Sequence, residues 1–384
     1  MNLKNDLSRI KDLKTPFFYY DMEILQSTLD ELKKCLEGTN FHVHYALKAN
    51  VNEPILRLIK DNGLGADCVS GNEVKRALES GFDPKDVVFA GVGKSDDEIS
   101  YALDQDIFAF NCESVQELEV INEMAGAKGK VAHVALRLNP NVDPETHQYI
   151  TTGLNDNKFG ISLSGLNVIF EKHQEWRNLE IEGIHFHIGS QVTNLDKYRE
   201  LSDRVNGLIE HFEEKGIHLS YINLGGGLGI DYENPENNPI APFKEYFDIF
   251  KNHLNIKSDK IVHFELGRSI VGQCGTLVTK VLYTKEGENT NFLIVDGGMT
   301  ELIRPALYQA YHKIISLTSD LPDKKYDVVG PICETSDFFG KGMHLAESGR
   351  GDLIAILSAG AYAEVMSSSY NLREKAKSFY SNQL

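Results

Sequence analysis

Lys48 is the first residue whose position suggests covalent chemistry, because it ends the run Tyr45-Ala46-Leu47-Lys48. Most lysines are solvated surface residues. A partly desolvated lysine at the end of a buried strand, however, loses its proton more easily and can attack an aldehyde. Lys48 is therefore a candidate for a covalent bond to an aldehyde-bearing ligand.

A glycine run, Gly225-Gly226-Gly227-Leu228-Gly229, follows another apolar segment. Glycine runs also serve tight turns, so the run alone is a weak signal. Its position after the seventh of eight expected strands favours a phosphate site, because bare backbone N–H groups can approach phosphate oxygens there.

His185 and His187 lie two residues apart and therefore on one face of a strand. Such a pair can supply two zinc ligands, but no clear third and fourth ligand accompanies it. We therefore expect no metal and favour an imidazole stacked on an aromatic ring. A core histidine with a backbone partner stays an alternative.

Acidic and sulfur groups complete the set of reactive side chains. Glu265 precedes Arg268 at the end of the last expected strand, where a surface salt bridge or a partner for a protonated ring nitrogen are both open. Cys333 and Glu334 stand near Asp337, and a thiol beside carboxylates suits proton donation better than nucleophilic attack.

These residues need a scaffold, and the region from 21 to 268 alternates short apolar runs with helical patterns. This alternation predicts a closed parallel (β/α)8 barrel of the TIM type. We expect strands near 42–49, 65–70, 87–92, 108–112, 131–139, 183–189, 221–226 and 262–267. We expect helices at 22–36, 53–61, 72–80, 95–104, 114–124, 163–174, 195–215 and 243–253. Ser95 with Glu98, and Ser114 with Glu117, predict capping boxes at two helix starts.

Four of the expected strands carry polar side chains at alternate positions and apolar side chains between them. The polar set comprises His42, His44, Lys48, His133, Arg137, His185, His187, His263 and Glu265. If the apolar positions face the helices, the polar ones face the barrel axis. Unpaired buried charges are costly, so this pattern favours mutual pairing or a polar ligand inside the barrel.

The chain after residue 268 changes character and predicts a second, mostly-β domain. The segments 270–283, 291–296, 326–332 and 353–358 are rich in β-branched residues. The early run Phe17–Tyr20 is expected to join them as an N-terminal strand. The expected domains are therefore a barrel at 22–268 and a β-rich domain formed by 1–21 plus 269–384. The polar segment 231–240 is expected to be an exposed loop.

Composition limits the function classes. The formal charge of −17 argues against nucleic-acid binding. No apolar stretch is long enough for a membrane helix, and the first residues show no secretory pattern. The five cysteines are widely spaced without a CxxC pair, which favours reduced thiols and a cytoplasmic location.

Taken together, the motifs resemble the barrel-type pyridoxal-phosphate decarboxylases over nearly the whole chain, and within them the branch acting on diaminopimelate. Each motif is modest alone, but their common order is specific. The matching segments are 45–50, 137–140, 151–160, 185–191, 225–229, 265–268, 304–308, 333–337, 360–362 and 369–371. One departure is Leu266, where the family usually has proline.

The resemblance implies a role for each matching residue. Lys48 corresponds to the lysine that bonds the cofactor, pyridoxal 5′-phosphate, and Cys333 to the acid that returns a proton to the product. The other implied cofactor-binding residues are His187, Ser190, Gly225, Gly226, Gly227, Glu265, Arg268 and Tyr362. The implied substrate-binding residues are Arg268, Arg304, Tyr308, Glu334 and Tyr362.

Arginines and a glutamate together favour a substrate whose far end carries both a carboxylate and an ammonium group. The expected reaction is decarboxylation of meso-2,6-diaminopimelate to L-lysine. The resemblance also implies a homodimer whose active site takes Cys333 and Glu334 from the partner. The alternatives are decarboxylation of carboxynorspermidine, ornithine or arginine, or a barrel that holds the cofactor without catalysis.

Overall fold

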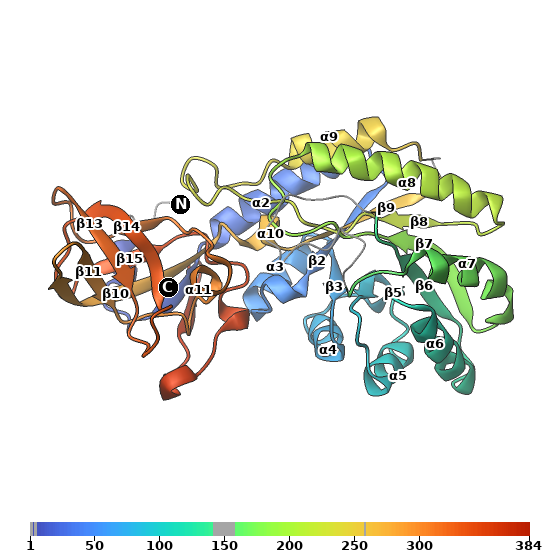
Figure 1. Cartoon of the computed structure of the whole chain (residues 1–384), viewed down its shortest axis with the longest axis horizontal. Helices are drawn as coiled ribbons and strands as arrows, with labels where there is room; N and C mark the ends of the chain where they lie inside the picture. The colour runs from blue at the N-terminus through green and yellow to red at the C-terminus, as the bar shows by residue number, and fades with distance from the viewer. Residues whose placement is uncertain (1–2, 4–5, 141–157, 257–258) are drawn as a thin grey trace. The chain divides into compact units, whose positions relative to one another are not determined.

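The computed structural model describes residues 3, 6–140, 158–256 and 259–384 (Figure 1). Residues 151–157, which are part of the predicted family-like segment 151–160, lie outside the described residues. The chain forms two compact units. We call Leu29–Gly229 with Pro242–Gly267 the barrel unit, and Met1–Thr28, Ile230–Ala241 and Arg268–Leu384 together the β unit.

Eight parallel strands of the barrel unit pair in chain order and close on themselves, which confirms the predicted barrel (Figure 1). The strands are β2 (Phe41–Ala46), β3 (Gly65–Cys68), β4 (Val87–Phe89), β5 (Ala109–Cys112), β6 (Ala132–Arg137), β7 (Leu179–His185), β8 (Tyr221–Asn223) and β9 (Ile261–Leu266).

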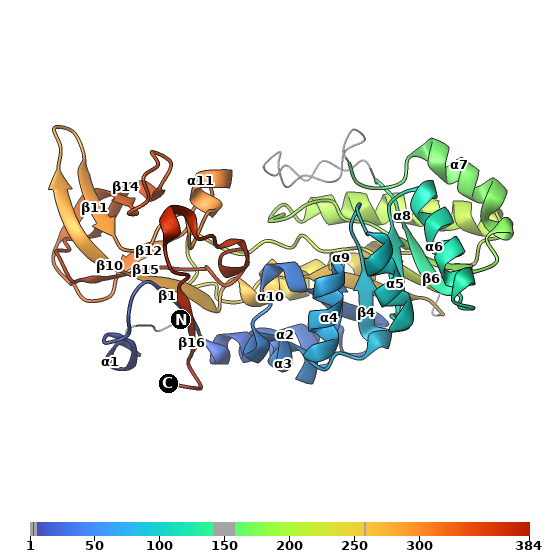
Figure 2. The same ribbon diagram turned by 90° about the horizontal axis from the view of Figure 1, so that it is seen from below.

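The helices agree closely with the predicted ranges. They are α2 (Met22–Leu36), α3 (Glu53–Asp61), α4 (Gly71–Glu79), α5 (Asp96–Asp104), α6 (Val115–Ala127), α7 (Leu163–Lys172), α8 (Asp196–Glu214) and α9 (Phe243–His253). Figure 2 shows α4, α5 and α6 side by side along the barrel, as their contacts require. Among the described residues, no helix has both the length and the apolarity for crossing a bilayer.

The last barrel strand differs from the other seven, because no long helix follows it. β9 is followed only by the four-residue α10 (Arg268–Val271), and the chain then enters a strand of the β unit. A glycine at 272 and a second at 275 allow this short turn, because a Cβ on Gly275 would collide with the backbone of Gly360. The eighth long helix, α2, instead precedes the first barrel strand.

The two predicted capping boxes differ. Ser95 and Glu98 form a complete box at α5. At α6, Ser114 accepts a hydrogen bond from the Glu117 backbone, but the Glu117 carboxylate accepts from the Glu113 N–H and pairs with Lys94. The Glu117 carboxylate therefore binds the buried ammonium group of Lys94 and does not complete a capping box.

Polar positions of β2 and β9 meet inside the barrel, as the alternation predicts. His44 on β2 and His263 on β9 are buried and stack with ring centroids 4.9 Å apart. The Nδ1 atom of His44 lies 3.1 Å from the Asp86 carbonyl oxygen, which can only accept a hydrogen bond. His44 Nε2 lies 2.6 Å from His263 Nδ1, so in a pair of neutral rings His44 Nε2 accepts from His263 Nδ1.

This imidazole pair makes the stability of the barrel pH-dependent. Burial, and then the charge of a neighbouring histidine, lowers the pKa of His44 to about 3 and that of His263 to about 2. In the unfolded chain both pKa values return to ~6.5. The unfolded state therefore binds more protons as pH falls below 6.5, and the free energy of unfolding decreases by about 2 kcal/mol per ring at pH 5.

We expect urea unfolding at pH 8 and pH 5 to show this loss, and the double variant His44→Asn/His263→Asn to show a smaller pH dependence. The exposed His253→Asn variant is the control and should match the parent. An identical pH dependence in the parent and the double variant would contradict the assignment of neutral rings.

The β unit contains one sheet with the order β12-β15-β10-β11-β13-β14, and β1 and β16 extend it beside β10. Its strands are β1 (Phe17–Tyr20), β10 (Gly275–Glu286), β11 (Asn291–Val295), β12 (Ile314–Ser316), β13 (Asp323–Val329), β14 (Phe338–Ala346), β15 (Leu353–Ile356) and β16 (Lys377–Tyr380). Its short helices are α1 (Leu7–Ile10), α10 and α11 (Arg304–Tyr308). The predicted N-terminal strand is confirmed, because β1 pairs antiparallel with β10.

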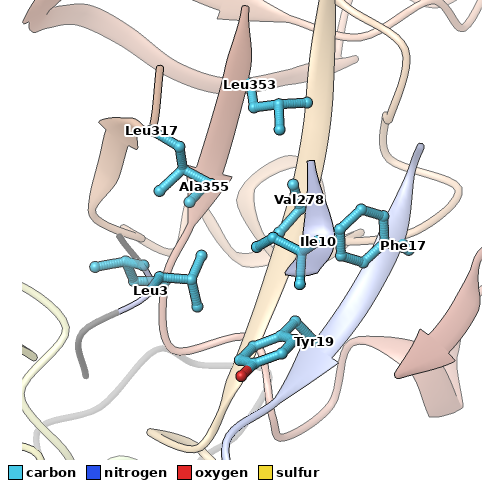
Figure 3. Packing of buried hydrophobic residues seen from close by; sticks show 9 residues of the cluster. Leu3, Ile10, Phe17, Tyr19, Val278, Leu317, Leu353 and Ala355 are labelled. Carbon is cyan, nitrogen blue, oxygen red and sulfur yellow. The ribbon is translucent and has the colours of Figure 1, made fainter. Parts of the chain in front are cut away.

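A hydrophobic cluster joins the two ends of the chain within this unit. Phe17 and Tyr19 of β1 and Ile10 of α1 pack against Val278 of β10 and Leu353 of β15 (Figure 3). All five side chains are buried. Apolar burial of this kind explains why an N-terminal strand belongs to a sheet formed mainly by the C-terminal third of the chain.

Candidate active site

A cavity of about 380 Å³ opens among the carboxyl ends of the barrel strands, where barrel enzymes place their active sites. It brings together three of the predicted site residues, Lys48, His187 and Glu265. Lys48 lies in a short 3-10 turn, Leu47–Ala49, directly after β2. The remaining lining residues are Asp67, Val69, Ala90, Gly91, Val92, Gly93, Arg137, Phe159 and His185.

Glu265 is held by three buried side chains. Its Oε1 accepts hydrogen bonds from Asn111 Nδ2 at 2.9 Å and Asn223 Nδ2 at 2.7 Å. Its Oε2 lies 2.9 Å from His185 Nε2. Burial alone would raise the pKa of Glu265, but the charge and hydrogen bond of His185, followed by the charge of Lys48, hold that pKa below its usual range. Glu265 is therefore a carboxylate at neutral pH.

His187 follows β7 and presents a neutral imidazole to the cavity. Burial, and then the charges of Lys48 and Arg137, hold its pKa well below the usual range. Its Nδ1 accepts a hydrogen bond from the Gly226 N–H at 3.4 Å. His185 and His187 thus have different neighbours: His185 lies beside Glu265, and His187 lies beside the glycine run. Ser190 is half-buried three residues beyond His187.

The glycine run lies tightly against neighbouring strand ends. A Cβ on Gly225 would collide with the carbonyl oxygen of Phe186, and one on Gly226 with that of Glu265. Gly225 and Gly227 have φ values of +66° and +108°, which favour glycine. No side chain fits at these positions, so the backbone itself is the surface that this turn offers.

Asp67, near the end of β3, lies in the cavity wall. Its side chain is buried, and Oδ1 has no hydrogen-bond partner among the described residues. Burial, and then the charge of Glu265, raise the pKa of Asp67 well above its usual range. A buried polar atom without a partner indicates a polar ligand.

Arg137 belongs to a predicted motif but had no assigned role. Its Nη1 lies 2.5 Å from Glu113 Oε1, and its guanidinium group lies 4.5 Å from the centre of the Phe159 ring. The other oxygen of Glu113 accepts from the Gly160 N–H at 2.8 Å. Glu113 and Phe159 therefore fix the direction in which Arg137 faces the cavity.

Sequence reasoning missed Asn111, Asn223 and the role of Glu113. Asn111 and Asn223 occupy inward positions of β5 and β8, so the same alternation that identified Glu265 could have found them. Glu113 lies in a loop after β5, and no periodic signal marks it.

In the β unit, three other predicted residues come together. Arg268 and Arg304 are buried, and both donate to the hydroxyl of Tyr232, at 2.6 and 2.9 Å. The Arg268 guanidinium group also lies 4.8 Å from the centre of the Tyr362 ring. Tyr308 ends the helix that Arg304 begins. The prediction that 231–240 is an exposed loop is wrong for Tyr232, because these two cations bind its side chain in the interior.

Cys333 and Glu334 lie in a separate loop of the β unit. Cys333 is exposed, whereas the other four cysteines are buried. Its N–H donates to Asn371 Oδ1 at 3.0 Å, and Tyr370 donates to Glu334 Oε1 at 2.6 Å.

Asp337, expected as a further acid beside Cys333, instead holds the Cys333 loop. Its carboxylate accepts from the N–H groups of Ile332 and Met299 at 2.7 and 2.6 Å. Asp337 is buried, and burial raises its pKa.

The residues that line the barrel cavity, and the glycine run beside it, suit pyridoxal phosphate. Lys48 provides an amine, Glu265 an ionised carboxylate for a protonated ring nitrogen, and His187 a neutral flat ring. The unpartnered oxygen of Asp67 adds a buried polar atom for a ligand. The backbone N–H groups of the glycine run, which no side chain can cover, suit a phosphate.

Comparison with known proteins agrees with this fit. Residues 23–272 match the family described as "Pyridoxal-dependent decarboxylase, pyridoxal binding domain". A protein from Bacteroides thetaiotaomicron named diaminopimelate decarboxylase is 49% identical over 379 residues, covering 98% of each chain. One of the same name from Aquifex aeolicus is 43% identical over 363 residues, covering 94% of this chain and 85% of the relative.

Solved structures give the same result. The crystal structure of diaminopimelate decarboxylase from Helicobacter pylori complexed with L-lysine has a TM-score of 0.91 and 40% identity, covering 97% of this chain and 93% of that chain. The extent of these matches, and a cavity that suits the cofactor, show that the chain belongs to the pyridoxal-dependent decarboxylase family.

Proposed function

We propose that the protein decarboxylates meso-2,6-diaminopimelate, releasing CO2 and L-lysine. The observation that most supports a decarboxylation is the buried, ionised Glu265 in the same cavity as Lys48. Two findings support the choice of substrate, namely the near-full-length similarity to diaminopimelate decarboxylases and the occurrence of L-lysine in a related structure.

When bound, pyridoxal phosphate supplies the electron sink that accepts the electron pair left after CO2 departs. Lys48 holds the cofactor covalently through Nζ. Glu265 keeps a proton on the cofactor's ring nitrogen because its own carboxylate stays ionised. Asn111, Asn223 and His185 orient that carboxylate.

The remaining roles belong to the β unit. Arg268 and Arg304 bind a carboxylate of the substrate, and Glu334 binds its far ammonium group. The thiol of Cys333 donates the proton that replaces CO2. Tyr308 and Tyr362 complete the proposed substrate site.

We also propose that two copies of the chain form a homodimer that shares its active sites. Large apolar side chains of the β unit are exposed, among them Leu372 at 97%, Tyr370 at 47% and Leu307 at 41%. Asn371 and Leu372 have positive φ values, and Asn371 accepts from the Cys333 backbone, so Leu372 projects from a fixed turn. Exposed apolar groups beside the proposed proton donor suit burial against a second copy.

Five free thiols favour a reducing compartment, the cytoplasm.

CO2 release from meso-diaminopimelate, L-ornithine, L-arginine and carboxynorspermidine tests the substrate. We expect kcat/KM for meso-diaminopimelate to exceed the others by about 1,000-fold or more, because the other substrates leave buried charged groups unpaired. A higher value for ornithine, arginine or carboxynorspermidine would assign the protein to another substrate. No CO2 from any of them by the cofactor-loaded protein would contradict catalysis.

A further inference from the structure

The two arginines of the β unit share one tyrosine hydroxyl. The Tyr232 oxygen lies 2.6 Å from Arg268 Nη1 and 2.9 Å from Arg304 Nη1, and all three side chains are buried. A guanidinium group only donates hydrogen bonds. The tyrosine oxygen therefore accepts twice, and its own proton must be donated elsewhere. The hydrogen bonds of the described residues include no acceptor for that proton.

The surroundings of Arg304 contain polar partners without negative charge. Besides Tyr232, its Nη1 donates to His312 Nε2 at 2.7 Å. His312 Nδ1 lies 2.8 Å from the Leu357 carbonyl oxygen and so carries the ring proton, which leaves Nε2 as an acceptor. Burial, and then the charge of Arg304, hold the pKa of His312 well below its usual range. His312 is thus neutral.

A buried cation among neutral groups requires an anion. Arg304 is 5% exposed, and no carboxylate pairs with it in the part of the chain that the structure describes. A buried charge without a counterion is strongly unfavourable. An anionic ligand that reaches Arg304 would also meet the hydroxyl proton of Tyr232.

Two features prepare Tyr232 as a donor. The guanidinium groups of Arg304 and Arg268 lie 4.8 and 5.9 Å from the centre of its ring, so the ring also supports both cations. Burial raises the pKa of Tyr232, but the charges of Arg268 and Arg304 outweigh burial and lower it. A more acidic hydroxyl forms a stronger hydrogen bond to an anion.

We propose that Tyr232 is a specificity-determining residue whose hydroxyl, fixed by Arg268 and Arg304, donates a hydrogen bond to the far carboxylate of the amino-acid substrate. His312 is a positioning residue, because it holds Arg304 from the other side. This inference rests on the proposed function and adds a residue to it. Basic amines without a far carboxylate gain nothing from this hydroxyl.

Tyr232→Phe in the cofactor-loaded protein tests the proposal, because it removes the hydroxyl and keeps the ring under both cations. L-lysine retains the carboxylate, and 1,5-diaminopentane is the same chain without it. By calorimetric titration we expect the variant to bind L-lysine about 10- to 100-fold more weakly and 1,5-diaminopentane with unchanged affinity. KM for meso-diaminopimelate should rise by a similar factor, and kcat should change much less.

Tyr246→Phe is the matched control, since it removes another buried tyrosine hydroxyl that has no hydrogen-bond partner among the described residues. It should bind both ligands like the parent. Equal weakening of L-lysine and 1,5-diaminopentane by Tyr232→Phe, or no weakening of either, would overturn the proposal. Weaker binding of pyridoxal phosphate with unchanged L-lysine affinity would also overturn it, by assigning the hydroxyl to the cofactor's phosphate.

The same measurements separate the two proposals. If the parent decarboxylates meso-diaminopimelate but Tyr232→Phe binds L-lysine normally, only the role of Tyr232 is wrong. If the parent neither decarboxylates meso-diaminopimelate nor binds L-lysine, the proposed function is wrong, and the inference about Tyr232 fails with it.

Discussion

Replacing Lys48 with alanine should lower kcat by at least about 1,000-fold and prevent covalent attachment of the cofactor. Lys48 follows β2 and lines the barrel cavity with Glu265 and His187. Alanine provides no nucleophile there. Borohydride reduction of the loaded protein, followed by peptide mapping, should place the label on residue 48 in the parent and on no residue in the variant. CO2 release gives the turnover.

The matched control is Lys75→Ala, which removes an exposed lysine from α4. It should keep both the label and the turnover. A label on another lysine in Lys48→Ala, together with activity near that of the parent, would contradict the role of Lys48. Retained noncovalent binding of the cofactor would be compatible with it, because Glu265, His187 and the glycine run remain.

The barrel and much of its site could be predicted because both follow from local sequence patterns. Alternation along β2, β7 and β9 identifies the inward side chains without knowledge of their partners. The same rule places Asn111 and Asn223 inward, but a neutral amide inside a barrel does not require a charged partner or a ligand as a buried charge does. Their importance appears only when both amides meet Glu265, at 2.9 and 2.7 Å.

Tyr232 and Asp337 show what sequence patterns do not contain. Tyr232 lies in a polar segment that resembles an exposed loop, and its burial results from arginines that are 36 and 72 residues away in the chain. Asp337 follows Cys333 closely enough to suggest shared chemistry. Its carboxylate, however, accepts from the backbone of Ile332 and Met299. The side-chain pattern of the sequence shows neither the distant arginines that bury Tyr232 nor the backbone N–H groups that bind Asp337.

The proposed dimer makes a second strong prediction, which concerns pairs of inactive variants. Cys333→Ala should lower kcat about 100- to 10,000-fold, because it removes the proposed proton donor. Binding of pyridoxal phosphate should change little, since Lys48, Glu265 and His187 belong to the barrel unit.

Mixing Lys48→Ala with Cys333→Ala under conditions of subunit exchange should restore about a quarter of the parent activity. In a symmetric dimer that shares its sites, each mixed dimer has one site with both defects and one site with neither. Random exchange makes half of all dimers mixed, and each of those has one working site of two. CO2 release measures the recovery, and two distinct affinity tags confirm that mixed dimers form.

The control mixture, Lys48→Ala with Glu265→Gln, should stay inactive, because both changes affect the same barrel cavity of one chain. In that mixture every site lacks one essential group. Recovery in the control would indicate back-exchange or contamination by the parent. No recovery in the Lys48→Ala and Cys333→Ala mixture, with mixed dimers present, would show that Cys333 does not act in the partner's site. The proton donor would then have to come from the same chain as Lys48, or be a residue other than Cys333.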